Sequence, residues 1–264
     1  MAEIPFRELA DQTHIHGLAV DPFNTTQLLV STHNGIFAVS RLGSAERISR
    51  TSDDFMSLTP HPTNRTILFA SGHPSDGGNL GLIRSVDGGR TWEQVSKGAV
   101  GQADFHSLAV SGADPRIMYG IYGGFQVSRD GGRTWHLGGQ LLDRIMDIAA
   151  SSLDPNTLYG ATYDGLLLSV DGGNSWHSAG LPTRPVSLVR AINGVVYAFF
   201  AGAGLMRAKE AVPQWELISK SDQVFNLMAF DPENTELLYA ITNDKQLLES
   251  RNGGQTWTPF QSDE

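Results

Sequence analysis

Histidines are the residues of this sequence best suited to chemistry, because five of its eight histidines recur at equivalent positions of a repeated pattern. Aligned on its apolar segments, the repeat places one set of residues in register: His16, Met56, His106, Met146 and Asn226. His14 lies two residues earlier, on the same side of an extended strand. Imidazoles suit Zn or Cu, and thioethers in register with them favour Cu(I). We therefore predict a Zn or Cu site formed by His14, His16 and His106, with Met56 and Met146 as further ligands.

Two simpler interpretations stay open for these residues. The histidines could line a water-filled channel as ordinary polar residues, and the two methionines could pack in the core, where methionine is common. No other cofactor is indicated by the sequence.

A second set of polar residues ends the next apolar segment of the repeat, and it comprises His33, His73, Tyr122, Tyr163 and Asn243. Together with Arg144, these residues are predicted to bind a ligand, with the two tyrosines and Phe55 as a stacking wall for a sugar. Asp54 and Asp104 occupy equivalent positions in neighbouring repeats, and paired carboxylates are the minimum machinery of glycoside hydrolysis. They are candidate catalytic residues; the alternative is that both accept hydrogen bonds from backbone or nearby histidines.

One turn sequence recurs along the chain, as SVDGGRTW at 85–92, SRDGGRTW at 128–135, SVDGGNSW at 169–176 and SRNGGQTW at 250–257. Together with Trp215, which marks a copy that has lost this turn, the tryptophans repeat every 39 to 43 residues. Each copy reads as four short strands with Gly, Asp, Pro and Asn between them. A period of about 40 residues with four strands is typical of a β-propeller blade.

The sequence thus predicts an all-β, six-bladed β-propeller of four-stranded antiparallel blades, forming one domain over residues 1–264. The blades are expected at 14–50, 54–97, 104–139, 143–180, 185–219 and 224–262. In such a fold the first strand starts, and the second strand ends, near one mouth of the central channel, which is where the predicted site lies. Residues 5–9 of the closing segment 1–13 are expected to form a strand on the outer edge of the sixth blade.

The repeated DGG turn is a folding device first. Ser, Asp and Asn side chains hydrogen-bond nearby backbone groups, and the glycines reach positive φ. The turn lacks the alternating oxygen ligands and the terminal Glu of an EF-hand loop, so its aspartates are not expected to bind calcium.

The pattern S-x-D-x-G-x-T-W is the Asp-box, or BNR, repeat, and over nearly its full length the chain resembles the sialidase-like Asp-box propellers. The segments HIHGLAVDP, SGHPSDGGNLGL and DFHSLAV look like those of bacterial propellers labelled glycosyl hydrolase or exo-sialidase. The resemblance implies that the box lies between the third and fourth strands, away from the site. It also implies an arginine triad for a sialidase, and only Arg144 falls at a suitable position. We expect no sialidase activity.

Composition narrows the classes of partner. A net charge of −9 is the wrong sign for a protein that binds nucleic acid. With 18% charged and 40% hydrophobic residues, the composition is not that of a membrane-spanning protein, and without cysteine the chain forms no disulfide. We expect a monomer, and an extracytoplasmic location with its signal removed is slightly favoured over the cytoplasm. The function predicted is a propeller that binds a metal, a sugar or another small molecule. The alternatives are a glycoside hydrolase of neutral sugars that uses Asp54 and Asp104, and a platform for protein partners or assembly.

Overall fold

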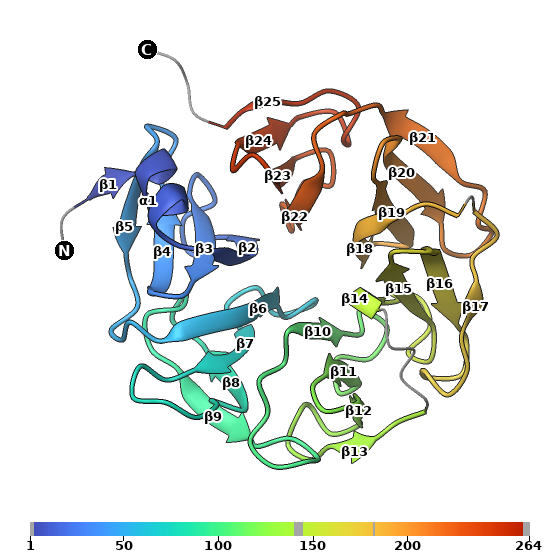
Figure 1. The fold of residues 1–264 in the computed structure, drawn as a ribbon, viewed down its shortest axis with the longest axis horizontal. Helices are drawn as coiled ribbons and strands as arrows, with labels where there is room; N and C mark the ends of the chain where they lie inside the picture. Colours follow the sequence, from blue (N-terminus) through green and yellow to red (C-terminus); the bar gives the residue numbers. More distant parts are fainter. Residues whose placement is uncertain (1–2, 140–144, 182, 261–264) are drawn as a thin grey trace. The chain divides into compact units, whose positions relative to one another are not determined.

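The computed structural model describes residues 3–139, 145–181 and 183–260, and it contains six antiparallel sheets. These sheets are the blades of the six-bladed β-propeller that the repeat predicts. Figure 1 labels the strands of each blade. The chain divides into two compact units. The first unit comprises Met1–Lys97, Gln102–His106 and Asn226–Glu264, and the second comprises Gly98–Gly101 and Ser107–Phe225.

The first unit holds blades 1, 2 and 6. Blade 1 has the order β1 (Ile4–Pro5), β5 (Ser44–Arg47), β4 (Gly35–Val39), β3 (Leu28–Thr32) and β2 (Ile15–Val20). Blade 2 has the order β6 (Asp54–Pro60), β7 (Leu68–His73), β8 (Leu82–Ser85) and β9 (Glu93–Ser96). Blade 6 has the order β22 (Phe225–Phe230), β23 (Leu238–Thr242), β24 (Leu247–Ser250) and β25 (Thr258–Pro259), its first residue belonging to the second unit.

The second unit holds blades 3, 4 and 5. Blade 3 consists of β10 (Ser107–Val110), β11 (Met118–Ile121), β12 (Phe125–Ser128) and β13 (His136–Leu137). Blade 4 consists of β14 (Ile145–Ala150), β15 (Leu158–Thr162), β16 (Gly165–Ser169) and β17 (His177–Ser178). Blade 5 consists of β18 (Val186–Ile192), β19 (Val195–Phe200), β20 (Gly204–Lys209) and β21 (Glu216–Ser219).

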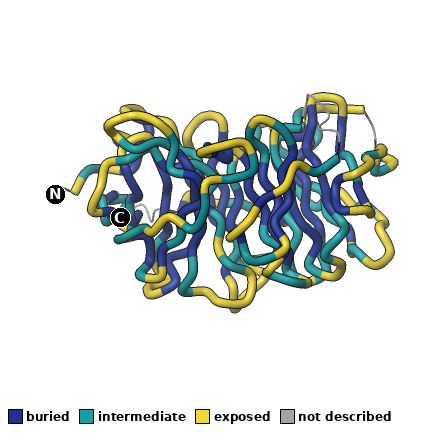
Figure 2. Tube along the Cα trace, turned by 90° about the horizontal axis from the view of Figure 1, so that it is seen from below, coloured by how far each residue is buried: buried dark blue, intermediate teal, exposed yellow. Residues whose placement is uncertain are grey.

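The second strand of a blade is buried on both faces, as β3 shows. Leu28 and Val30 contribute to an apolar cluster with Tyr239 and Phe260 of blade 6, whereas Leu29 contributes to a different cluster with blade 2. Successive side chains of a strand point to opposite faces, so a strand between two neighbouring sheets needs apolar residues at every position. Figure 2 shows the buried strands in dark blue and the exposed turns between them in yellow.

The Asp-box turns lie between the third and fourth strands, as predicted, and their aspartates are used by the turn itself. In the second blade, Asp87 accepts hydrogen bonds from the amide of Thr91 at 2.9 Å and from its hydroxyl at 2.6 Å. Ser85 accepts a hydrogen bond from the amide of Gly89 at 2.9 Å. The same contacts recur around Asp130 and Asp171, and Asn252 replaces the aspartate in the sixth blade.

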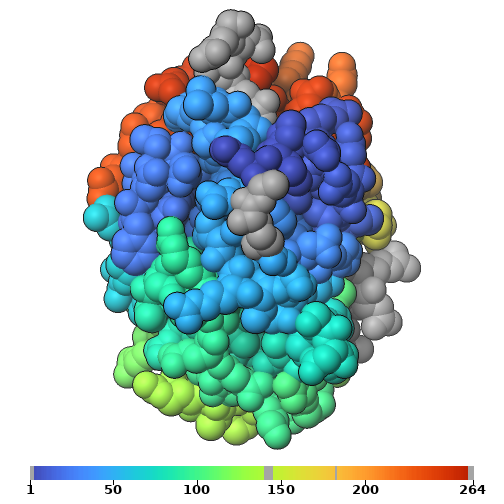
Figure 3. Space-filling view, turned by 90° about the vertical axis from the view of Figure 1, so that its left-hand side faces the viewer, coloured from blue at the N-terminus to red at the C-terminus, as the bar shows by residue number. Residues whose placement is uncertain are grey.

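The N-terminal segment differs from the prediction. Residues 5–9 do not form a strand on blade 6: β1 pairs with β5 of blade 1, and α1 (Phe6–Gln12) follows it. Figure 3 shows this segment, in the darkest blue, on the surface of blade 1. Phe6, Leu9 and Ala10 recur with helical spacing and are buried, which is why a helix forms here. Across the described residues, no helix has the length and apolar character needed to cross a membrane.

Candidate functional site

A cluster of histidines and aspartates lies in the first unit, at the strand ends of blades 1 and 2 and on the segment that leads out of blade 2. His33 occupies the tight turn between β3 and β4. The hydroxyl of Thr32 shapes this turn, because it donates to the carbonyl of Gly35 at 3.0 Å and accepts from the amide of Asn34 at 3.0 Å. Gly35 has φ 115°, a conformation that favours glycine. The turn thus holds His33 at the tip of a hairpin.

A bulge in the first strand of blade 1 and another in the first strand of blade 2 change the direction of side chains near the cluster. The pairing of β2 with β3 skips His16, and the pairing of β6 with β7 shifts between Met56 and Thr59. A bulge adds a residue to one strand and redirects the side chains on either side of it. Within the second bulge Ser57 has φ 53°, which is unusual for a residue other than glycine.

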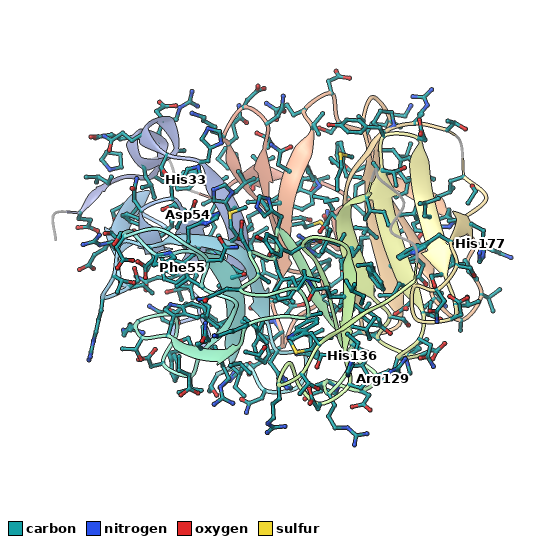
Figure 4. All side chains as sticks on the ribbon, turned by 60° about the horizontal axis from the view of Figure 1, so that its bottom comes forward. His33, Asp54, Phe55, Arg129, His136 and His177 are labelled. Atoms are coloured by element: carbon teal, nitrogen blue, oxygen red, sulfur yellow. The ribbon has the colours of Figure 1, made fainter. Side chains whose placement is uncertain are left out.

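His16, His33 and Asp54 form the first of two groups, which we call the blade 1 group. Nδ1 of His33 donates to Oδ2 of Asp54 at 2.6 Å, and Nε2 of His16 lies 3.7 Å from Oδ1 of the same carboxylate. Nε2 of His16 also lies 3.4 Å from the ring nitrogens of His33. Figure 4 shows His33 and Asp54 next to each other. Oδ1 of Asp54 is buried and has no hydrogen-bond partner.

His73, Asp104 and His106 form the second group, which we call the blade 2 group. One oxygen of Asp104, Oδ2, accepts from Nε2 of His73 at 2.9 Å and from Nε2 of His106 at 2.6 Å. Only 2% of the Asp104 side chain is exposed, and its other oxygen is buried without a hydrogen-bond partner. Nδ1 of His73 donates to the carbonyl of Gly78 at 2.9 Å. That bond fixes the ring, so a metal ion would bind at Nε2 after displacing the proton that Nε2 shares with Asp104.

The backbone around Asp104 is held by blade 2. The amide of Phe105 donates to Oγ of Ser71 at 2.8 Å, and Oγ of Ser57 donates to the carbonyl of Phe105 at 2.5 Å. The amide of Gly81 donates to the carbonyl of Ala103 at 2.9 Å. The carboxylate therefore has a fixed position, which a preorganised binding site requires.

The two groups adjoin one another through blade 2, because Asp54 on β6 pairs directly with His73 on β7. His14 lies beside the blade 1 group, with its ring centroid 5.3 Å from that of His33 and 6.3 Å from that of His16. The cluster therefore contains all five histidines that the repeat alignment selected.

The environment shifts the pKa values of three histidines of the cluster, and not all in the same direction. Burial lowers the pKa of His16 to about 4, and it outweighs the opposite effect of Asp54. The hydrogen bond to the Gly78 carbonyl, aided by Asp104, raises the pKa of His73. The hydrogen bond to Asp104 raises the pKa of His106. His16 is thus neutral over the physiological range, the state in which imidazole binds a metal.

Each group matches the donor set of a transition-metal site. In either group, one donor atom from each of the three side chains lies within 4.8 Å of the other two. Ligand atoms 2.0–2.1 Å from a tetrahedral Zn²⁺ are about 3.3 Å apart, which is close to the 3.4 Å between the His16 and His33 nitrogens. The buried carboxylate oxygens without partners provide further acceptors. Three protein ligands leave the fourth position of a tetrahedral ion open to water or substrate.

The predicted site residues are distributed over both units. Asn243 is exposed in the first unit, on the turn after β23, and Met56 lies on β6 two residues after Asp54. Tyr122, Tyr163 and Met146 belong to the second unit, where Tyr163 is 66% exposed. Arg144 lies outside the described residues. The repeat alignment placed His16 and Met56 at equivalent positions, whereas in the structure the side chain of His16 lies next to that of Asp54.

The remaining histidines have other surroundings. Nδ1 of His61 accepts hydrogen bonds from the amides of Thr63 and Asn64, so this ring replaces the aspartate of the turn between β6 and β7. His136 and His177 are exposed on the fourth strands of blades 3 and 4. The sequence prediction missed the supporting contacts of Ser57, Ser71 and Gly78. In the sequence, these residues look like ordinary strand and turn residues, so no pattern marks them as part of the site.

Comparison with known proteins supports the fold. The family model for the BNR/Asp-box repeat matches residues 126–137, around the Asp box of blade 3. No curated protein matches the sequence of this chain.

Three solved structures illustrate the likeness. The GH74 xyloglucanase from Xanthomonas campestris is 19% identical with a TM-score of 0.61, and the match covers 93% of this chain and 45% of that one. The GH74 enzyme from Niastella koreensis is 18% identical with a TM-score of 0.63 and the same coverage. YCF48 from Cyanidioschyzon merolae is 14% identical with a TM-score of 0.53, covering 94% of this chain and 85% of that one.

This chain spans less than half the length of the two GH74 enzymes, and at these identities the likeness is one of fold. The repeated turn explains both the period of the sequence and the matched family model. The chain is a six-bladed β-propeller, and the BNR/Asp-box model matches one copy of its repeated turn.

Proposed function

We propose that this propeller binds divalent transition-metal ions at the blade 1 and blade 2 groups. One observation supports the proposal above all. Each of the two adjoining groups brings two imidazoles to one aspartate, and each aspartate has a buried oxygen without a hydrogen-bond partner. Burial of a carboxylate oxygen without a hydrogen bond costs free energy, and a bound cation would remove that cost.

The donor atoms indicate the class of metal. Both groups offer only nitrogen and oxygen, which suit Zn²⁺ or Cu²⁺, whereas Cu(I) prefers sulfur. Zn²⁺ is the natural first probe because it takes tetrahedral sites of imidazole and carboxylate without redox chemistry. The exposed rings of His33 and His106, 46% and 66% exposed, give an ion a route from solvent.

Isothermal titration of the untagged, chelator-treated chain with Zn²⁺ tests the proposal. We expect two ions per chain, one fewer in His33→Ala and one fewer in His106→Ala. His136→Ala is the matched control, because His136 is an exposed histidine outside both groups. Full binding by both single variants, or no binding by the parent chain, would contradict the proposal.

Glycoside hydrolysis by Asp54 and Asp104 is the alternative. Both carboxylates already accept a hydrogen bond from histidine, which leaves one oxygen of each for other chemistry. Hydrolysis of a chromogenic glycoside of a neutral sugar that survives EDTA and is abolished in Asp54→Asn would favour this alternative over metal binding.

A further inference from the structure

We infer that a hollow beside blade 2, separate from the two metal groups, binds an aromatic carboxylate. The hollow lies in the first unit and has a volume of about 380 Å³, within the range of small-molecule sites. Its walls come mainly from the connection between β5 and β6 with the start of β6, the segment between β7 and β8 with the start of β8, and the Asp-box turn between β8 and β9. The residues that decide its chemistry are Arg50, Phe55, Leu80, Ile83, Arg90 and Trp92.

The floor of the hollow is apolar and aromatic. Phe55 and Ile83 are 1% and 3% exposed, and the ring centroids of Phe55 and Trp92 lie 5.3 Å apart. The indole Nε1 of Trp92 donates to the carbonyl of Gly89 at 3.0 Å, which fixes the orientation of the ring. Phe55 and Ile83 expose almost no surface of their own, so a flat ring in the hollow would pack against the half-buried indole of Trp92, whose orientation is already fixed.

The rim of the hollow is cationic. Of the lining residues, Arg50 and Arg90 are positively charged and Asp53 is negatively charged. This excess of positive charge contrasts with the net charge of −9 of the whole chain. Among the described residues, the Arg50 guanidinium makes no hydrogen bond or ion pair. Nη1 of Arg90 donates to the carbonyl of Asp87 at 2.9 Å, and this bond holds the guanidinium at the rim with donors to spare.

The carboxylates near this rim already accept hydrogen bonds from neutral groups. Oδ1 of Asp53 accepts the amide of Ser75 at 3.0 Å, and the Asp87 carboxylate is used by the Asp box. A carboxylate entering the hollow would meet the fork geometry that guanidinium offers to planar anions. The apolar floor fits a planar ring, and the cationic rim fits one carboxylate on that ring. A neutral ring or a strongly hydroxylated ring fits this combination less well.

This inference does not depend on metal binding. Asp53 and Phe55 flank Asp54, and Pro74 follows His73, but no lining residue is a member of either metal group. Binding in the hollow and binding of Zn²⁺ can therefore fail separately, and both are measured on the same protein.

The test is calorimetric titration of the chelator-treated chain with benzoate, indole-3-carboxylate, glucuronate and the neutral analogue benzyl alcohol. We expect the two aromatic carboxylates to bind, and Arg50→Gln and Arg90→Gln each to weaken them about tenfold, as loss of a hydrogen bond to a charged group does. Arg133→Gln is the matched control, because Arg133 makes the same contact in the Asp box of blade 3 and does not line the hollow.

Arg50→Lys should recover part of the loss, since lysine restores the charge without the fork. Equal binding of benzyl alcohol and benzoate, tighter binding of glucuronate than of benzoate, or an equal loss in Arg133→Gln would each overturn the inference. So would the absence of measurable binding of either aromatic carboxylate. Zn²⁺ titration of Arg50→Gln should match that of the parent chain, which keeps the two sites distinguishable.

Discussion

Asp54 on β6 and His73 on β7 are paired directly across blade 2, so one pair of strands contributes a residue to the blade 1 group and a residue to the blade 2 group. The negative charge of Asp54 also acts on His73 and His106, since it favours the protonated form of both rings. A change at Asp54 should therefore reach both groups.

We predict that Asp54→Asn removes one Zn²⁺ from the chain and weakens the other roughly threefold, as loss of a nearby screened charge would. Calorimetric titration gives both the stoichiometry and the remaining affinity. Asp76→Asn is the control, because Asp76 lies on an exposed loop of the same blade and has no part in either group. An unchanged affinity of the second ion would show that the two groups are independent.

The bulge residue Ser57 is predicted to support the blade 2 group. Its φ of 53° carries a steric cost for any residue with a Cβ, and its hydroxyl bond to Phe105 offsets that cost. Ser57→Ala should lose about 1 kcal/mol of unfolding free energy, and Ser57→Gly less, because glycine removes the steric cost as the bond is lost. Thermal or urea unfolding measures this order.

Both Ser57 variants should also weaken Zn²⁺ binding in a His33→Ala background, which isolates the blade 2 group. The reason is that Phe105 stands between Asp104 and His106, and the lost bond loosens the backbone that holds them. Unchanged affinity in that background would limit Ser57 to a role in folding.

The sequence was sufficient to predict the blades because the same turn and the same strand pattern recur at a fixed period. It also selected the five clustered histidines, since strand ends occupy equivalent places in every blade. It could not predict which aspartate meets which histidine, because the bulges fall at His16 in blade 1 and between Met56 and Thr59 in blade 2. A shift of one residue reverses the face of every side chain beyond it.

The Asp boxes are predicted to contribute to stability against acid. The hydrogen bonds from Thr134 hold the pKa of Asp130 at about 2, and those from Ser175 do the same for Asp171. Because the folded-state pKa lies below that of the unfolded chain, this contribution is complete above about pH 4 and is lost as the pH falls from about 4 to 2. The unfolding free energy should therefore fall across that window, which urea unfolding at successive pH values measures.

Two substitutions at Asp130 separate charge from hydrogen bonding. Asp130→Asn should retain most of the stability at pH 7, because Asn252 makes the equivalent bond to the amide of Thr256 at 2.9 Å in the sixth blade. Asp130→Ala should lose about 1 kcal/mol, since the amide of Thr134 loses its acceptor. Urea unfolding at pH 7 and pH 3 checks both. Zn²⁺ binding should not change, and a loss of bound metal would place an ion at the Asp box.

The last prediction concerns α1, which the strand-based prediction for the N-terminus overlooked although Phe6, Leu9 and Ala10 carry helical spacing. Phe6 is 2% exposed in the apolar cluster that blades 1 and 6 share, and its amide donates to the carbonyl of Gly43 at 2.7 Å. Phe6→Ala should lower the unfolding free energy by about 3–5 kcal/mol, because a buried aromatic ring leaves a cavity. Arg7→Ala, a change to a side chain that is 65% exposed, should cost less than about 0.5 kcal/mol. Urea unfolding compares the two, and equal stabilities would mean that α1 does not pack on blade 1 in solution.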